Sequence, residues 1–190
     1  MKINQFNQIT AAFCLILSWN PGIADLNAQT IKPKTMEQII IKSPAFPQNE
    51  MIPSKYTCDG ENISPTLDWS DLPAETKSIA LIIDDPDAPS GDWVHFVLFN
   101  IPPDTRHLNE NFNPVNKPKP EIRAGKNSRG TLDYHGPCPP SGTHRYFFKL
   151  YALDIVLKQA EGISKQDLLK AIEGHVIAKG ELIGLYKKLK

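Results

Sequence analysis

The 190-residue sequence carries no excess of charge of either sign, because 21 lysines and arginines stand against 21 aspartates and glutamates. Binding to nucleic acids is driven mainly by neutralisation of phosphates, so a neutral chain has no global electrostatic reason to seek DNA or RNA. The sequence also lacks a Walker loop, a G-x-G-x-x-G loop, a G-x-S-x-G elbow, an H-E-x-x-H helix and paired C-x-x-C motifs. We therefore expect no nucleic-acid partner, no cofactor, no metal and no catalytic residues.

Long hydrophobic runs are absent as well. The apolar run 9–19 (ITAAFCLILSW) has 11 residues, whereas a membrane-spanning helix needs about 20. It follows a short segment with one lysine and no acid, and Asn20-Pro21-Gly22 ends it, which is the layout of a secretory signal peptide. We predict a signal peptide at 1–24, with a second cleavage option after Ala28. A flexible lead-in at 25–38 and one domain at 39–190 follow, in a periplasmic or secreted protein without stable membrane insertion.

Cysteine is scarce, with three residues in the whole chain. Removal of the signal peptide leaves two of them, Cys58 and Cys138. In an oxidising compartment such a pair can form a disulfide. The sequence does not show whether the two Cα atoms lie close enough, so a disulfide and two unpaired buried thiols both remain open.

Proline is abundant, at 17 residues, which disfavours helical bundles and favours a β-rich protein with shaped loops. Short apolar and β-branched runs predict strands at Ile39–Ile41, Thr66–Trp69, Ser78–Ile83, Trp93–Ile101 and His144–Leu153.

The C-terminal segment has a different pattern. Ser164 followed by Asp167 is a variant of the capping box, and the apolar spacing from Leu168 onward predicts a helix. Similar spacing beyond Gly174 predicts a second short helix. The expected fold class is mainly β: an antiparallel sandwich or barrel with short C-terminal helices.

Polar side chains punctuate the predicted strands. Alternation places His144 and Tyr146 on one face of their strand, and His95 on the face that also carries Trp93, Val97 and Phe99. If the strands are neighbours, four side chains converge at one end of the sheet: Asp85, His95, His144 and Tyr146. The loop 134–140 would form the opposite wall.

Imidazole, phenol and backbone N–H groups are donors, and converging donors suit an anionic oxygen such as phosphate or carboxylate. Asp85 would then accept a hydrogen bond from a histidine and fix its orientation. His107 and His135 are expected to be exposed loop residues.

Other interpretations of the same residues stay open. A histidine on an apolar strand, such as His95, is commonly a core residue, and Asp85 can be a turn former. A hydrolase using Asp85, His95 or Cys138 is a further alternative. A zinc or iron site is possible in principle, built from Asp85, Asp87, His95 and His144.

Four segments together resemble the phosphatidylethanolamine-binding protein family, in its bacterial Raf-kinase-inhibitor-like branch. They are Tyr56–Pro65 (YTCDGENISP), Asp85–Pro89 (DPDAP), Trp93–Phe96 (WVHF) and Gly136–Tyr146 (GPCPPSGTHRY). The resemblance extends from about Ile39 to Tyr186.

This resemblance implies a β-sandwich with a small anion pocket at one end. Family members bind phosphate-like groups, including a phospholipid head group, and some inhibit kinases or proteases, with no common catalytic activity. The residues carried over to the pocket by motif are Asp85, His95, His144 and Tyr146, with Gly136, Pro139 and Pro140 in its wall. Asp87 would support the turn. Cys138 departs from the glycine of the better-known eukaryotic members, which changes the backbone contact there.

We therefore expect a non-enzymatic secreted or periplasmic protein that binds a small anionic ligand, phosphate or a phospholipid head group. The alternative is an interaction protein that inhibits a protease or another enzyme through its proline-rich rim.

Overall fold

A computed structural model describes residues 37–114 and 121–189. The predicted signal peptide and most of the predicted lead-in lie outside these ranges. The described elements are β1 (Glu37–Gln38), β2 (Ile40–Lys42), β3 (Glu50–Met51), the 3-10 helix η1 (Ser54–Tyr56), β4 (Leu67–Ser70), β5 (Ser78–Asp85), β6 (Trp93–Ile101), β7 (His107–Leu108), β8 (Arg123–Ala124), β9 (Thr143–Leu153), α1 (Lys165–Ile172) and β10 (Val176–Lys187).

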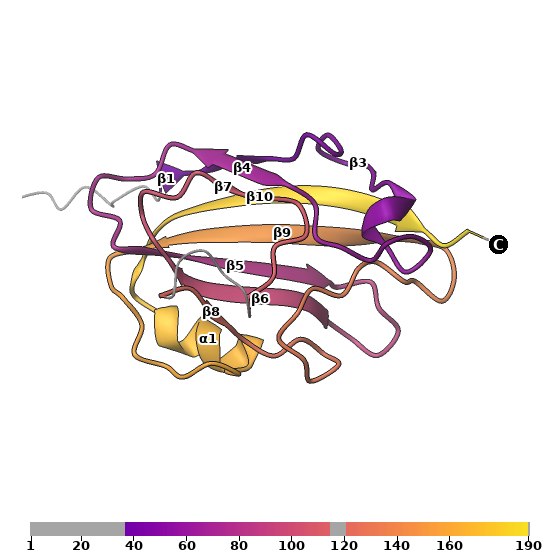
Figure 1. The fold of residues 1–190 in the computed structure, drawn as a ribbon. Coiled ribbons are helices and arrows are strands. Elements are labelled where there is room, and N and C mark those ends of the chain that lie inside the picture. The colour runs from indigo at the N-terminus through magenta and orange to yellow at the C-terminus, as the bar shows by residue number, and fades with distance from the viewer. Residues whose placement is uncertain (1–36, 115–120, 190) are drawn as a thin grey trace, which may run out of the picture. The chain divides into compact units, whose positions relative to one another are not determined.

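The strands form two sheets (Figure 1). The larger has the order β1-β10-β9-β5-β6-β8, with β3 also paired to β10, and the smaller has the order β2-β4-β7. The long central strands are antiparallel, while the two-residue strands β1 and β3 run parallel to β10. The predicted fold class, mainly β with a sandwich of sheets, is confirmed.

The central strand β5 (SIALIIDD) is buried at every position. Because its side chains alternate, Leu81 and Ile83 pack in the apolar core that the smaller sheet shares, while Ala80 and Ile82 pack in a second core with α1. In Figure 1, α1 accordingly lies across the larger sheet from β4 and β7. The sheet that carries the polar strand ends is thus covered on both faces.

The first predicted C-terminal helix is present as α1. Ser164 is its N-cap, and its hydroxyl accepts the N–H of Asp167 at 3.1 Å. Among the described helices none is long and apolar enough to cross a membrane.

The prediction of a second helix beyond Gly174 is wrong, because this segment forms the strand β10. Its residues pair with β9 from Val176 to Lys187, and every second side chain from Ala178 onward is buried. Two of these inward positions are glycines that bring neighbouring segments close: a Cβ on Gly180 would lie 2.3 Å from the Ile39 carbonyl oxygen. The helical spacing of the apolar residues was real, but the alternation and the pairing with β9 decide the structure.

Candidate functional site

A cavity of about 360 Å³ lies where β5 ends and β6 and β9 begin. Since β5 runs antiparallel to both neighbours, the end of β5 and the starts of β6 and β9 meet at one end of the sheet. Five of the predicted site residues line the cavity: Asp85, His95, Pro139, Pro140 and His144.

Asp85 and His144 form a buried hydrogen-bonded pair at this end of the sheet. The Nδ1 of His144 donates to Asp85 Oδ2 at 2.8 Å, and the backbone N–H of Asp87 donates to Asp85 Oδ1 at 2.8 Å. Both carboxylate oxygens are therefore engaged, and the imidazole orientation is fixed. This arrangement leaves the other ring nitrogen of His144, Nε2, without a bond to Asp85. Asp85 thus orients the imidazole as the sequence analysis expected.

His95 reaches the cavity through a β-bulge. Ile83 pairs with Phe96 and Asp84 with Val94, so His95 is an extra residue in β6 at this point. A bulge redirects a side chain locally, and here it breaks the alternation. The prediction that His95 shares a face with Val97 and Phe99 is therefore wrong. Those two pack towards α1, whereas the His95 ring meets Tyr146 edge to face at 5.2 Å.

The two ring nitrogens of His95 differ in their hydrogen bonding. Its Nδ1 lies 2.5 Å from the carbonyl oxygen of His135, while its Nε2 has no hydrogen-bond partner in the described protein. The side chain is buried, and this burial lowers the pKa of His95 to about 4. The imidazole is therefore neutral near pH 7.

Tyr146 is buried against the His95 ring and is not among the residues that line the cavity. Its hydroxyl makes no hydrogen bond with the described residues. Burial, and after it the charge of nearby Asp85, raises the pKa of Tyr146, so the hydroxyl stays protonated. Tyr146 therefore meets the site through its ring contact with His95, and its protonated hydroxyl is an unpaired buried donor among the described residues.

The wall loop 134–140 presents Pro139, Pro140 and Cys138 to the cavity, but Gly136 faces away from it. The Gly136 N–H donates to Asn62 Oδ1 at 2.8 Å, and a Cβ on this glycine would lie 2.3 Å from the Tyr56 carbonyl oxygen. Gly136 therefore permits close packing of the loop on the segment around η1. Its own N–H is bonded to Asn62 and so is not available to a ligand.

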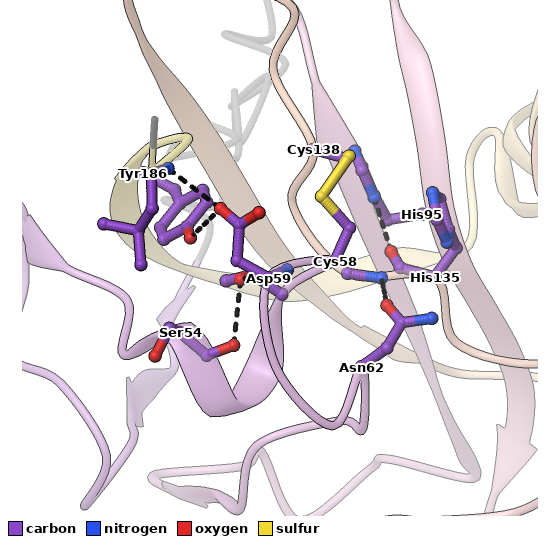
Figure 2. The surroundings of a disulfide bond; sticks show 11 residues. Ser54, Cys58, Asp59, Asn62, His95, His135, Cys138 and Tyr186 are labelled. Carbon is purple, nitrogen blue, oxygen red and sulfur yellow. Dashed lines mark hydrogen bonds between the residues drawn. A yellow bond between two sulfur atoms is a disulfide. The ribbon is translucent and has the colours of Figure 1, made fainter.

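A disulfide joins Cys58 to Cys138, with 5.4 Å between their Cα atoms (Figure 2). This pairing was one of the two alternatives that the sequence left open. Two hydrogen bonds run beside it: the Cys58 N–H donates to the Pro137 carbonyl at 3.1 Å, and the Tyr134 hydroxyl donates to the Tyr56 carbonyl at 2.9 Å. The cavity wall is therefore attached to the η1 segment by covalent and polar links.

Two lining residues with charged or titratable side chains were given no individual role at the cavity in the sequence analysis. His135, expected in an exposed loop, is buried, and its ring stacks on His95 at 5.9 Å. Arg129 brings an exposed cation to the rim in a turn held by Asn127, whose Oδ1 accepts the Arg129 N–H at 2.9 Å. Neither has a local sequence signal, because each depends on where a long loop returns to β6.

Asp87 fastens the turn that carries Asp85. Its carboxylate accepts the backbone N–H of Arg145 at 2.9 Å and two guanidinium hydrogen bonds at 2.7 and 2.9 Å. The hydrogen bond from the Arg145 side chain is the main reason that the pKa of Asp87 falls to about 2.

The low pKa predicts how this turn responds to acid. A carboxyl whose pKa is depressed on folding stabilises the protein above its unfolded pKa of about 4, and that stabilisation is lost as pH falls through about 2. Carboxyl NMR should show Asp87 titrating near pH 2, and Asp87→Asn should remove the corresponding loss of stability between pH 4 and 2. Titration of Asp87 near pH 4 in the folded protein would contradict the interpretation.

No group of three or more His, Cys, Asp or Glu side chains is placed to hold a metal ion within 37–114 and 121–189. The candidate metal set does not gather around one point, since Asp85 is bonded to His144 and Asp87 turns to Arg145.

Comparison with known proteins identifies relatives over most of the chain. The family model described as phosphatidylethanolamine-binding protein matches residues 42–187. A UPF0098 protein of Methanothermobacter thermautotrophicus is 57% identical over 148 residues, covering 78% of this chain and 98% of the relative.

Two crystal structures share the fold. A protein of Chlamydia trachomatis, named as a homologue of phosphatidylethanolamine-binding protein, has a TM-score of 0.74 and 41% identity, covering 80% of this chain and 99% of that one. The E. coli protein YbcL, described as a new member of the mammalian family, has a TM-score of 0.74 and 28% identity, covering 80% of this chain and 99% of its own.

Proposed function

The chain belongs to the phosphatidylethanolamine-binding protein family, and we propose that its cavity binds a small anionic ligand through a phosphate-like group, supplied as free phosphate or as a phospholipid head group. The observation that carries this proposal is the unpaired Nε2 of His95, buried at the cavity beside the oriented ring of His144. An unsatisfied buried polar atom costs about 1–3 kcal/mol, and a polar ligand recovers that cost.

We further propose that the protein binds without catalysing a reaction and needs no cofactor. Cys138 is held in a disulfide and so has no thiolate to act as a nucleophile. The two oxygens of Asp85 are engaged by His144 and by the Asp87 N–H, which suits an orienting role.

A secreted or periplasmic location is part of the same proposal. A signal-peptide pattern precedes the domain, and the two cysteines that remain after cleavage are bonded across a sequence separation of 80 residues. Disulfides persist in oxidising compartments, so both features support export.

A second candidate function is inhibition of a protease or another enzyme through the rim. The exposed Pro89 and Pro140 lie at the same cavity, and the adjacent disulfide stiffens the loop that carries Pro140. Inhibition of a defined protease that is unchanged by His144→Ala would favour this function over ligand binding.

An NMR titration of the mature protein with phosphorylethanolamine tests the leading proposal. Shifts should cluster on Asp85, His95 and His144, and His144→Ala should weaken binding by roughly 10–100-fold, because a hydrogen bond to a charged group contributes about 1.5–3 kcal/mol. His107→Ala is the matched control: His107 is exposed, lies outside this cavity and should leave affinity unchanged. A folded protein without clustered shifts at millimolar ligand would refute ligand binding.

A further inference from the structure

The backbone of His135 determines which nitrogen of His95 carries the proton. A carbonyl oxygen can only accept, so the 2.5 Å contact requires a proton on Nδ1 of His95. A second bond, from the His135 N–H to the His95 carbonyl at 3.1 Å, and the stacking of the two rings hold the pair together. Neutral His95 therefore has an unpaired lone pair on the buried Nε2, in a residue that lines the cavity.

The other groups around this nitrogen restrict what can meet it. The Asp85 carboxylate comes from β5, His144 and the neutral Tyr146 come from β9, His135 stacks from the wall loop, and Arg129 is exposed at the rim. A fully ionised phosphate group has only acceptors, so its oxygens would face the Nε2 lone pair and stand near a carboxylate.

A protonated phosphate group does not meet this conflict. A phosphomonoester with one proton has a P–OH that can donate to Nε2 of His95. Its ionised oxygens are left for the Arg129 guanidinium and, when His144 carries a second proton on its Nε2 beside Asp85, for that imidazolium. The single acidic group of a phosphodiester is ionised from pH 5 to 8, so in that range it has no P–OH to donate. To make the same hydrogen bond with a diester, His95 itself would have to take up a proton.

We infer that the cavity selects phosphomonoesters that carry one proton and discriminates against phosphodiesters, with His95 as the specificity-determining residue and the His135 carbonyl as the group that makes it an acceptor. This inference rests on the proposed phosphate-binding function. It distinguishes two sources of the same chemistry: an intact membrane phospholipid is a phosphodiester and is rejected, whereas a released head group such as phosphorylethanolamine is a monoester and is accepted.

Three small probes test the inference in NMR titrations of the mature protein from pH 5 to 8. They are phosphorylethanolamine, its phosphonate analogue 3-aminopropylphosphonate, and the diester glycerophosphorylethanolamine. All three carry an ammonium group, and the monoester and the phosphonate differ only in the atom that joins the carbon chain to phosphorus.

The expected results differ for each probe. Affinity for phosphorylethanolamine should fall about tenfold per pH unit above the second pKa of the ligand, near 6. The phosphonate should show the same fall at a higher pH, because its second pKa is higher. The diester should bind roughly 100-fold more weakly than the monoester at pH 6, because His95, with a pKa of about 4, must then be protonated from solvent.

A spectrum and a variant complete the test. In the ligand-free protein, ¹⁵N spectra of the histidine rings should show an unprotonated Nε2 at His95. His95→Gln, whose amide can turn its NH₂ towards the ligand, should reduce the difference between monoester and diester to a few-fold, while His107→Gln should preserve it. If His95→Gln does not fold, the probe series and the spectrum still decide the matter.

The outcomes separate this inference from the function on which it depends. Equal binding of the diester, a flat monoester profile through the ligand pKa, or one common midpoint for monoester and phosphonate would overturn the selectivity and leave anion binding intact. Absence of binding for all three probes at every pH would overturn both.

Discussion

Replacing Cys58 and Cys138 together with alanine is expected to lower the free energy of unfolding by roughly 4 kcal/mol. The disulfide closes a loop across a sequence separation of 80 residues, and a longer closed loop removes more conformational freedom from the unfolded chain. Urea denaturation of the oxidised wild type and of the double variant measures the difference. The wild type unfolded in the presence of a dithiol reductant should match the variant.

The same replacement is expected to change ligand affinity much less than stability. Three hydrogen bonds still attach the wall loop to the η1 segment, with donors on Cys58, Tyr134 and Gly136. Below its unfolding transition, the variant should bind phosphorylethanolamine within a few-fold of the wild type. Loss of binding in a variant that remains folded would instead make the disulfide the main determinant of the cavity shape, and a stability loss below about 1 kcal/mol would contradict the loop-closure explanation.

Periodicity predicted the parts of the fold that are governed by burial. The apolar run Trp93–Ile101 has the bounds of β6, and the alternation from His144 to Ala152 matches the buried and less buried residues of β9. Both strands are long and central, so their patterns are dictated by the two apolar cores that they separate.

The failures arise where one element depends on another. At Val176–Lys187, the inward Gly180 leaves room for the Ile39 backbone and Gly184 for the Ile52 side chain. The segment pairs with β9 as a strand although its apolar spacing also fits a helix. The bulge at His95 depends on the register with β5, which no single strand encodes. Arg129 and His135 join the cavity because their loop returns to β6, where the Ser128 N–H donates to Val94 and the His135 N–H to His95.

A buried ion network on the opposite side of β5 from Asp85 involves Asp84. Lys149 Nζ lies 2.8 and 2.9 Å from the two oxygens of Asp84, and Lys165 Nζ lies 2.5 Å from one of them. Lys165 also contacts Asp92, just before β6. The Asp84 side chain has no solvent exposure. A lysine in the first turn of α1 opposes the helix dipole, so it is this network that accounts for its position.

Removal of one member of this network should cost far more than removal of the pair. Asp84→Leu leaves the largely buried Lys165 with only the partly exposed Asp92 as a partner, and is expected to lower the free energy of unfolding by up to about 3–5 kcal/mol. The double variant Asp84→Leu/Lys165→Met should recover most of that loss, because an apolar pair replaces the buried ions, and Lys149 is exposed enough to turn towards solvent. Urea denaturation of the two variants, of Lys165→Met and of the wild type completes the double-mutant cycle.

The cycle also shows what the network does for the cavity. Asp84 and Asp85 are adjacent, so a β5 end held on one face by Lys149 and Lys165 keeps Asp85 directed at His144 on the other. If packing alone holds that strand end, the double variant will bind phosphorylethanolamine as tightly as the wild type. If the ions specify its position, the double variant will regain stability but bind more weakly, with a changed His144 ring signal. Equal destabilisation of the single and double variants would contradict the pairing itself.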